Sequence, residues 1–465
     1  MSCGVCCERT DLRGDRMTPR AHTSKTDGHL TRGRAKRVFK VGELATSVGS
    51  SYVWQALRWP FRSVDKRQQA LLDTHIKNAI RIVERSKELR GAFMKLVQML
   101  SMRDDILPSE ALQVLSVVQS SVPPMSYALI RKQITRELGG PPEAVFAAFE
   151  AQAFAAASLG QVHKARLKSG EEVVVKVQYP GVEETVNQDL RNVKALLQTF
   201  TLIGRDVMRQ KIDESDVYRE LEERLHEELD YVNEAKNIAL FQKMFRDDDE
   251  VIIPRVYPDV SSRRVLTMTM VECYPFKDIL SPGVDQSVKD WVALKYFRVL
   301  WRQIFEFGVL HTDPHPGNYL VTFHPKLAIL DFGSVRIFPE DIRKAYHQLA
   351  RATLKRDEAT MADCFLRLGF LDPGASPEPL VRIMYVILGP VLEDQIYDPR
   401  DFHSVEKGME IASIGLENRL FKAPGHRVFL ARALMGLDSY LKQFGTVTNW
   451  HREFKRCVEA VKERD

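Results

Sequence analysis

Apolar residues recur at intervals of three and four over residues 66–102, which is the spacing of one face of an α-helix. Pro108 ends this helical region, and a further helix is predicted over about 126–138. The run Gly139-Gly140-Pro141-Pro142 stops that second helix. The apolar repeat of the first region consists of two series: Leu72, Ile76, Ala79 and Val83, and then Phe93, Leu96 and Leu100.

The pattern changes to that of β-strands over residues 144–180. The β-branched run Glu172–Gln178 predicts a strand, and Ser169-Gly170 predicts a hairpin turn before it. We therefore expect a strand–loop–strand–turn–strand unit. Beyond it, the pattern predicts helices over 183–203, 213–245 and 287–307, strands over 251–256 and 263–271, two strands after residue 318, and helices over most of 339–465.

The net charge of +5 is confined to one end of the chain. Residues 1–38 hold nine Lys and Arg against four acidic residues, an excess that equals the charge of all 465 residues. The basic character therefore describes a tail and does not indicate a nucleic-acid-binding domain. We expect a disordered, solvated tail, with contact to an anionic membrane surface as the alternative. Residues 39–62 mix Trp and Phe with basic residues, which suits a membrane interface or an arm packed on the domain.

Cysteine usage and hydropathy predict a cytoplasmic protein, bound at most peripherally to a membrane. The six cysteines are a C-x-x-C-C run at Cys3, Cys6 and Cys7, with no second cluster to complete a zinc site, and three scattered residues. No run of apolar residues reaches the ~18–20 needed to span a bilayer. The first thirty residues lack the apolar segment of a signal peptide.

Three separate segments carry residues of the kind that phosphoryl transfer requires. Lys176 stands in the valine-rich strand, Asp313 and Asn318 stand five residues apart in a loop, and Asp331-Phe332-Gly333 follows an apolar strand. Phosphoryl transfer uses a lysine to neutralise phosphates, an Asn and an Asp to hold Mg²⁺, and a further carboxylate to orient or deprotonate the acceptor. The order D-x-x-x-x-N and then D-F-G is that of a protein kinase. A lone strand lysine would more often be a solubilising charge on an edge strand.

Longer motifs around these residues resemble the UbiB family of atypical kinase-like proteins, which is tied to ubiquinone and other isoprenoid-quinone lipids. The motifs are FAAASLGQVHKARLKSGEEVVVKVQYPGV, EELDYVNEAKN, HTDPHPGN and LDFG. The resemblance runs from about Lys66 to beyond Arg336, and more loosely to the C-terminus. It implies an α+β, bilobal protein-kinase-like fold with an N-terminal helical extension and a helical C-terminal region. It also implies Mg-ATP as the ligand and ATPase or unorthodox kinase activity in support of quinone-lipid metabolism.

The resemblance implies a role for each matching residue. Asp313 is the general base, Lys176 contacts phosphate and Glu234 orients Lys176. Asn318 and Asp331 hold the metal. An alanine-rich loop covers the phosphates, and an N-terminal extension lies over the place where a protein kinase binds its peptide. An acidic E-x-D element on the helix predicted over 213–245 acts together with this extension. The loop residues are Ala155, Ala156, Ala157 and Ser158; the extension residues are Lys95 and Gln98, and the acids are Glu228 and Asp230. Peptide substrates are therefore not expected.

Several positions depart from related patterns. Val97 replaces a family glycine, which adds bulk to the extension, and Thr312 stands where protein kinases have Arg. No lysine follows Asp313 by two positions, because His315 occupies that place. Alanines replace the glycines of a kinase loop, and an alanine at positive φ costs roughly 1–2 kcal/mol. We expect His311 to hydrogen-bond the backbone of the loop that carries Asp313.

Two other functions fit the motifs. An H-x-D-x-H-P-G-N loop also occurs in small-molecule phosphotransferases of the aminoglycoside- and choline-kinase type, although those lack the alanine-rich loop and the extension. A nucleotide-sensing module without turnover would carry the same residues. We divide the chain into a basic tail over 1–38, an amphipathic arm and helical extension over 39–125, an N-lobe over 126–272, a C-lobe over 273–350 and a helical region over 351–465.

Overall fold

The chain folds into two compact units. The computed structural model describes residues 40, 42–44, 46–51, 54, 64–89, 93, 96–97, 124–157, 159–191, 194, 214–313, 317–418 and 425–461. Unit 1 comprises residues up to Ala239 together with Pro254–Met270, and unit 2 comprises Leu240–Ile253 together with Val271–Asp465. The expectations for the tail over 1–38, and for Lys95, Gln98, Ser158 and His315, lie outside the described residues.

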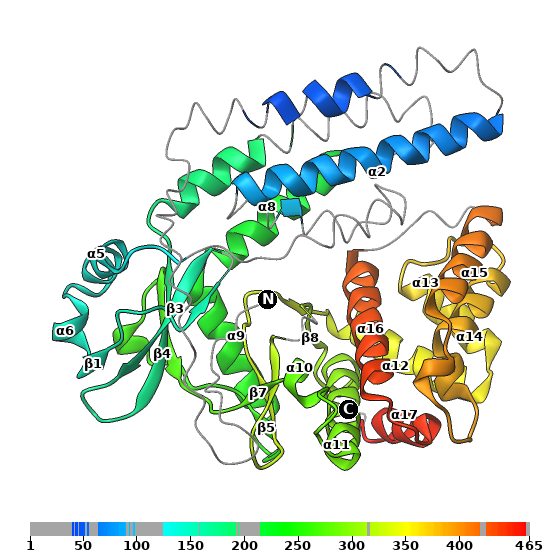
Figure 1. The fold of residues 1–465 in the computed structure, drawn as a ribbon. Helices are drawn as coiled ribbons and strands as arrows, with labels where there is room; N and C mark the ends of the chain where they lie inside the picture. Colours follow the sequence, from blue (N-terminus) through cyan, green and yellow to red (C-terminus); the bar gives the residue numbers. More distant parts are fainter. Residues whose placement is uncertain are drawn as a thin grey trace. The chain divides into compact units, whose positions relative to one another are not determined.

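Unit 1 contains an antiparallel sheet in which β4 is an interior strand (Figure 1). The predicted strand Glu172–Gln178 is confirmed as β4, and Gly170 adopts φ 104° in the turn that precedes it. Because β4 pairs with both β3 and β6, Lys176 does not lie on an edge strand. The sheet has the order β1-β3-β4-β6, with β2 also paired to β3; the strands are β1 (Ala148–Phe149), β2 (Ala155–Ala156), β3 (Gly160–Arg166), β4 and β6 (Val265–Thr269).

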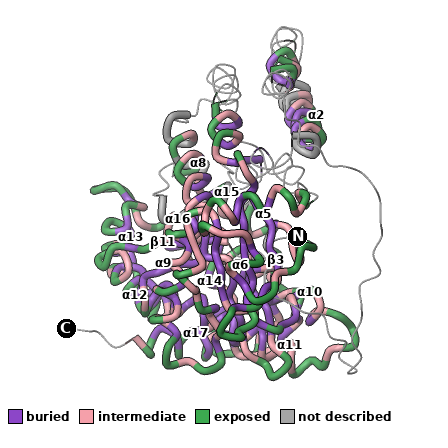
Figure 2. The backbone as a smooth tube through the Cα atoms, turned by 90° about the vertical axis from the view of Figure 1, so that its left-hand side faces the viewer, coloured by how far each residue is buried: buried purple, intermediate pink, exposed green. Residues whose placement is uncertain are grey.

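The buried core of unit 1 includes residues from the N-terminal extension. Helix α2 spans Val64–Leu89, and its Ala79 and Val83 are buried, as the helical spacing predicts. Buried and exposed residues alternate along α2 (Figure 2). Phe93, Leu96 and Val97 belong to the same buried apolar cluster as three valines of β4, which are Val173, Val175 and Val177. The apolar face predicted from the spacing is therefore buried, and Val97 contributes to the core.

Two helices follow where the sequence predicts one over 213–245. Helix α8 spans Glu214–Glu228 and helix α9 spans Tyr231–Met244, so the chain breaks its helix at Leu229-Asp230. The single-helix prediction is wrong there, because Asp230 turns its side chain back to cap α9. Two helices precede the strands of this sheet in the sequence, α5 (Tyr127–Leu138) and the short α6 (Pro142–Val145).

Unit 2 is mainly helical, as the pattern beyond residue 339 predicts. Its four-stranded sheet has the order β5-β10-β9-β7, and β8 pairs with β11. The predicted helix over 287–307 is α11 (Gln286–Arg302), continued by a π-helical turn, η3 (Gln303–Phe307). The strands are β5 (Val251–Ile252), β7 (Tyr274–Pro275), β8 (Val309–His311), β9 (Tyr319–Val321), β10 (Leu327–Ile329) and β11 (Val335–Ile337). The other helices are α10 (Phe276–Ile279), α12 (Glu340–Lys355), α13 (Glu358–Arg367), α14 (Glu378–Leu392), α15 (Ser404–Glu417), α16 (Gly425–Phe444) and α17 (Trp450–Glu459). Across the described part of the chain, no helix is both long and apolar enough to cross a bilayer.

Gly160 begins β3 at a point where β4 approaches its backbone closely. A Cβ atom at this position would lie 2.3 Å from the Val177 carbonyl oxygen, and that oxygen belongs to the backbone and cannot swing away. The strand register places Gly160 opposite Gln178, which stands two residues after Lys176 in β4. Position 160 therefore requires glycine because there is no space for a Cβ atom. The backbone conformation is not the reason, since φ of Gly160 is not positive.

Gly160→Ala should push β3 and β4 apart and lower the free energy of unfolding by on the order of 1–3 kcal/mol, the usual cost of overpacking. Gly140→Ala is the matched control, because a Cβ there meets only ordinary side-chain contacts at 3.6 and 3.7 Å. Urea unfolding of the two variants measures the difference. Equal stability of the two would contradict the close approach.

His163 ties the segment before the alanine-rich loop to β3. Its Nδ1 lies 2.8 Å from the Glu150 carbonyl oxygen and donates to it, while Nε2 accepts from the Gln161 amide at 2.9 Å. The ring stacks on Phe149 with centroids 5.0 Å apart. Burial lowers the pKa of His163 below its ordinary value of 6.5, although hydrogen bonds from the ring to the backbone at Glu150 and Gln152 oppose this.

Because the folded-state pKa of His163 is lowered, the unfolded chain binds more protons than the folded chain around and below pH 6.5. The free energy of unfolding therefore decreases as the pH is lowered. The free energy of unfolding of the wild type, relative to His163→Gln, should decrease from pH 7.5 to 5.5. The slope should not exceed ~1.4 kcal/mol per pH unit, the limit for one proton. Urea unfolding across this range tests it; a difference that does not change with pH would contradict a buried neutral ring.

Candidate functional site

Lys176 and Glu234 form a buried ion pair inside unit 1. Nζ of Lys176 lies 2.9 Å from both carboxylate oxygens of Glu234. The two side chains are only 7% and 2% exposed. The Lys176 ammonium also lies 5.1 Å from the centroid of the Tyr231 ring, which adds a cation–π contact. The structure therefore brings together the lysine and the glutamate that the family resemblance pairs.

The break between α8 and α9 places Glu234 on the first turn of its helix. Oδ1 of Asp230 accepts hydrogen bonds from the backbone N–H groups of Val232 and Asn233, at 3.0 and 3.2 Å. A side chain in this position satisfies amides that a helix start leaves without partners. Asp230 is thus the N-cap of α9, while Glu228 is the last residue of α8 and half-buried. Their roles near a nucleotide remain predictions.

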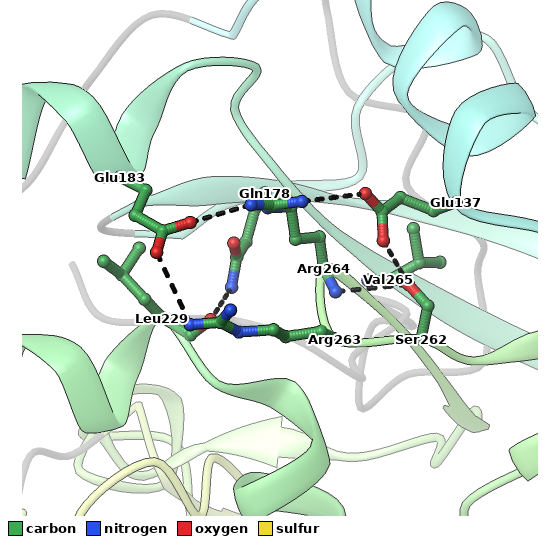
Figure 3. A network of polar contacts seen from close by, with 8 residues as sticks. All are labelled: Glu137, Gln178, Glu183, Leu229, Ser262, Arg263, Arg264 and Val265. Carbon is green, nitrogen blue, oxygen red and sulfur yellow. Dashed lines mark hydrogen bonds and ion pairs between the residues drawn. The ribbon is translucent and has the colours of Figure 1, made fainter.

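Two hydrogen bonds hold this break, one from β4 and one to the segment before β6, and Figure 3 shows the first of them. Nε2 of Gln178 donates to the Leu229 carbonyl oxygen at 2.7 Å, and the Tyr231 N–H donates to the Arg263 carbonyl oxygen at 3.1 Å. Gln178 stands two residues after Lys176 in β4, on the same face of the sheet. One strand therefore supplies the lysine and also a hydrogen bond that fixes where its partner helix begins.

A network of charged residues surrounds the same region (Figure 3). The Arg264 guanidinium pairs with Glu183 at 2.7 Å and with Glu137 of α5 at 3.2 Å. Its hydrogen bond lowers the pKa of Glu183 below the ordinary value. The hydroxyl of Ser262 donates to the second oxygen of Glu137 at 3.0 Å. The network joins α5 and the segment after β4 to the residues directly before β6, Ser262 and Arg264.

The alanine-rich loop is a short hairpin in the described residues. Ala155 and Ala156 form β2, and the Ala157 N–H donates to the Gly160 carbonyl oxygen at 2.9 Å. Among the described residues other than glycine, positive φ occurs only at Asp331 and Arg356. The alanines therefore avoid the left-handed conformations that glycine-rich loops use. Their contact with phosphates remains a prediction.

In unit 2, the loop after β8 holds Asp313 on both oxygens. Nδ2 of Asn318 donates to Asp313 Oδ2 at 3.0 Å and to the Asp313 carbonyl oxygen at 3.2 Å. Nη2 of Arg432, from α16, donates to Asp313 Oδ1 at 2.7 Å. The Asp313 carboxylate therefore has a fixed orientation. The sequence prediction paired Asp313 with Asn318 but missed Arg432.

Asn318 has the chemistry of a metal ligand. Its Nδ2 is used on Asp313, and its Oδ1 is buried with no hydrogen-bond partner in the part of the chain that the structure describes. Since a buried amide oxygen normally has a donor, this one fits a cation. No cluster of three or more His, Cys, Asp or Glu residues suited to a metal occurs among the described residues. One amide and one carboxylate, with phosphate oxygens and water, match the needs of Mg²⁺.

Strand pairing brings Asp331 next to Asn318. Ile329 of β10 lies opposite Tyr319 of β9, and the Leu330 N–H donates to the Asn318 carbonyl oxygen at 2.8 Å. Asn318 and Asp331 thus flank the ends of two paired strands. Asp331 has φ 59°, a left-handed conformation that Asp adopts more readily than most residues. Its Oδ1 accepts from the Gly333 N–H at 3.2 Å.

His311 holds the backbone of the Asp331 loop. Its Nε2 donates to the Asp331 carbonyl oxygen at 2.7 Å, so His311 bonds backbone as expected, but that of the Asp-Phe-Gly segment and not that of its own loop. Burial lowers the pKa of His311, although the nearby charges of Asp313 and Asp331 oppose this. Phe332 packs against the ring of Phe241 with centroids 4.9 Å apart and is fully buried. The backbone of Asp331 is thus held by His311, and the next residue, Phe332, is held by packing.

A paired strand lysine in unit 1 and an Asp/Asn loop followed by Asp-Phe-Gly in unit 2 define a kinase-like protein. Residues 117–365 match the ABC1 atypical kinase-like domain, which covers more than half of the chain. The chain belongs to this family, the UbiB family of atypical kinase-like proteins.

Individual relatives agree with this assignment. The chain is 31% identical over 340 residues to the mitochondrial atypical kinase COQ8 of Saccharomyces cerevisiae, covering 73% of this chain and 66% of that protein. It is 34% identical over 385 residues to the chloroplastic protein ACTIVITY OF BC1 COMPLEX KINASE 3 of Arabidopsis thaliana, covering 81% and 52%. The chain thus spans about half to two thirds of the length of these curated relatives.

A solved structure supports the fold. Rv3197 from Mycobacterium tuberculosis, solved in complex with erythromycin, superposes with a TM-score of 0.58 at 24% identity, over 84% of this chain and 97% of that one. The expected α+β kinase-like fold is confirmed.

Glu234→Ala should leave the buried ammonium of Lys176 without its counter-charge and lower the free energy of unfolding by about 3–5 kcal/mol. Asp247→Ala is the control, because the Asp247 side chain is 88% exposed in its pair with Arg246. Removal of an exposed pair should change stability by only ~0–1 kcal/mol. Urea unfolding measures both, and a loss for Glu234→Ala no larger than for the control would contradict a buried pair.

Proposed function

We propose that this chain is an atypical kinase or ATPase that binds Mg-ATP in support of ubiquinone or other isoprenoid-quinone lipid metabolism. The observation that carries the proposal is the buried pair between Lys176 and Glu234, 2.9 Å apart on an interior strand. A protein fold gains little from such a pair as a stability device, since desolvation offsets most of the attraction. In protein kinases the same arrangement orients a lysine toward the nucleotide phosphates.

The loop residues of unit 2 support the proposal that the nucleotide binds together with a metal ion. Asn318 offers a buried amide oxygen with no donor in the described residues, and Asp331 lies beside it at the ends of paired strands. We assign these two residues to Mg²⁺, which would supply charge neutralisation of the phosphates. Asp313 would orient or deprotonate the phosphoryl acceptor, and its carboxylate is already held on both oxygens.

The quinone-lipid role rests on family membership. One relative is described as a mitochondrial atypical kinase, and another as the chloroplastic protein ACTIVITY OF BC1 COMPLEX KINASE 3. We propose that the acceptor is water or a small molecule, with quinone-lipid precursors as the candidate class, and that the basic residues of 1–38 contact an anionic membrane surface. Peptides are not proposed as substrates, because the family places its extension over the peptide site. Nucleic acid is not proposed as a partner, since the chain beyond residue 38 has no net charge.

Asp331→Asn should abolish the Mg²⁺-dependent part of the rise in Tm that ATP produces, because it removes the charged ligand of the metal. A ligand at a hundred times its Kd stabilises by about 2.7 kcal/mol, so the effect is measurable by thermal shift with ATP in MgCl₂ or in EDTA. Asp247→Asn is the control, because Asp247 is an exposed carboxylate. An unchanged Mg²⁺-dependent increment in Asp331→Asn would overturn the metal assignment.

Asp313→Asn should affect turnover and not binding, in contrast to Asp331→Asn. Nucleotide binding should survive and turnover should fall by about 10²-fold or more, the usual contribution of a general base. ATP hydrolysis, measured with and without anionic liposomes and small phenols, also tests the proposed role. Wild-type protein that binds Mg-ATP but shows no turnover under any of these conditions would favour a nucleotide sensor instead.

A further inference from the structure

The loop that carries Asp313 contains no basic side chain apart from its histidines. From His311 to Asn318 the sequence is HTDPHPGN, with no lysine or arginine. Phosphoryl transfer develops negative charge that enzymes offset with nearby cations. The cation beside Asp313 comes instead from Arg432, which is 119 residues away along the chain. It lies beyond residue 365, where the match to the family domain ends.

Arg432 is fixed in place by contacts on either side of it along α16. One turn before it, the Phe429 ring lies 4.9 Å from the Arg336 guanidinium of β11. Towards the end of α16, the rings of Tyr440 and Phe444 pack on Phe276, with centroids 5.5 and 5.3 Å apart. A helix anchored at both ends holds its middle residue at a set position, so the contact with Asp313 is part of the fold of unit 2.

The surroundings of Asp313 strengthen its pairing with a cation. Burial, and then the nearby charge of Asp313, raise the pKa of Tyr319 and of Tyr440. Asp313 therefore lies near two buried tyrosines, and charges interact more strongly there than in bulk water. The side chains of Arg432 and Asp313 are 20% and 25% exposed, so the pair is partly shielded from solvent.

We propose that Arg432 is a positioning residue for phosphoryl transfer, holding one oxygen of Asp313 while Asn318 holds the other. The inference rests on the proposed function, since it assigns Arg432 a role in the same site. Two fixed contacts remove the rotation of the carboxylate, so that Asp313 faces the acceptor before the reaction begins. The helical C-terminal region thereby completes the catalytic loop.

The test compares Arg432→Gln and Arg432→Lys with a matched control in the full chain. Lys442→Gln breaks the Lys442–Asp438 pair on the same helix, whose side chains are 24% and 29% exposed. Mg-ATP binding is measured by thermal shift, and kcat and KM for ATP are measured by hydrolysis. Arg432→Gln should lower kcat by about 10- to 100-fold, the range expected for a displaced catalytic group, with little change in KM. Arg432→Lys should retain an intermediate kcat, and Lys442→Gln should behave as wild type.

The outcomes separate this inference from the proposed function. A wild type that neither binds Mg-ATP nor hydrolyses it would overturn the proposed function itself. An active wild type with an equal or higher kcat in Arg432→Gln would overturn the inference alone, since the pair would then be structural or inhibitory. A fall in kcat equal to that of Lys442→Gln would also overturn it. If Arg432→Gln does not fold, Arg432→Lys decides: reduced kcat at unchanged KM supports the inference, and unchanged kcat overturns it.

Discussion

Lys176 carries a positive charge into the middle of an apolar sheet, and much of unit 1 is arranged around that charge. A buried ammonium group requires a counter-charge and complete hydrogen bonding. Glu234 supplies the counter-charge, but only because α9 begins three residues before it. That beginning is fixed by the Asp230 cap and by the bond from Gln178 to Leu229. The helix break, the cap and the neighbouring strand residue are therefore consequences of placing one lysine.

Features that depend on neighbouring residues could be predicted from the sequence. The strand over Glu172–Gln178 follows from its β-branched residues, and the turn before it follows from a glycine at positive φ. The loop from Asp313 to Asn318 and the Asp-Phe-Gly segment were found from their spacing. The pairing of Lys176 with Glu234 came from the family resemblance, because the two residues are 58 positions apart and no local pattern joins them.

Features that depend on the folded arrangement could not be predicted. The helical pattern runs without interruption through 213–245, and one capping aspartate is hard to distinguish among the many acids there. The need for glycine at position 160 appears only when β4 lies against it. Arg432 is one of many arginines on helices, and its role became visible only from its contact with Asp313. In each case the deciding contact joins segments that are distant in sequence or depends on strand register.

The distance along the chain between Asp313 and Arg432 has a consequence for the order in which the protein is made. The ribosome completes the loop first and adds its arginine 119 residues later. At about 5–20 residues per second, this interval is roughly 6–24 s. During that time the Asp313 carboxylate of the nascent chain lacks its contact with Arg432. The loop of Asp313 therefore reaches its final arrangement only after α16 has left the exit tunnel and packed.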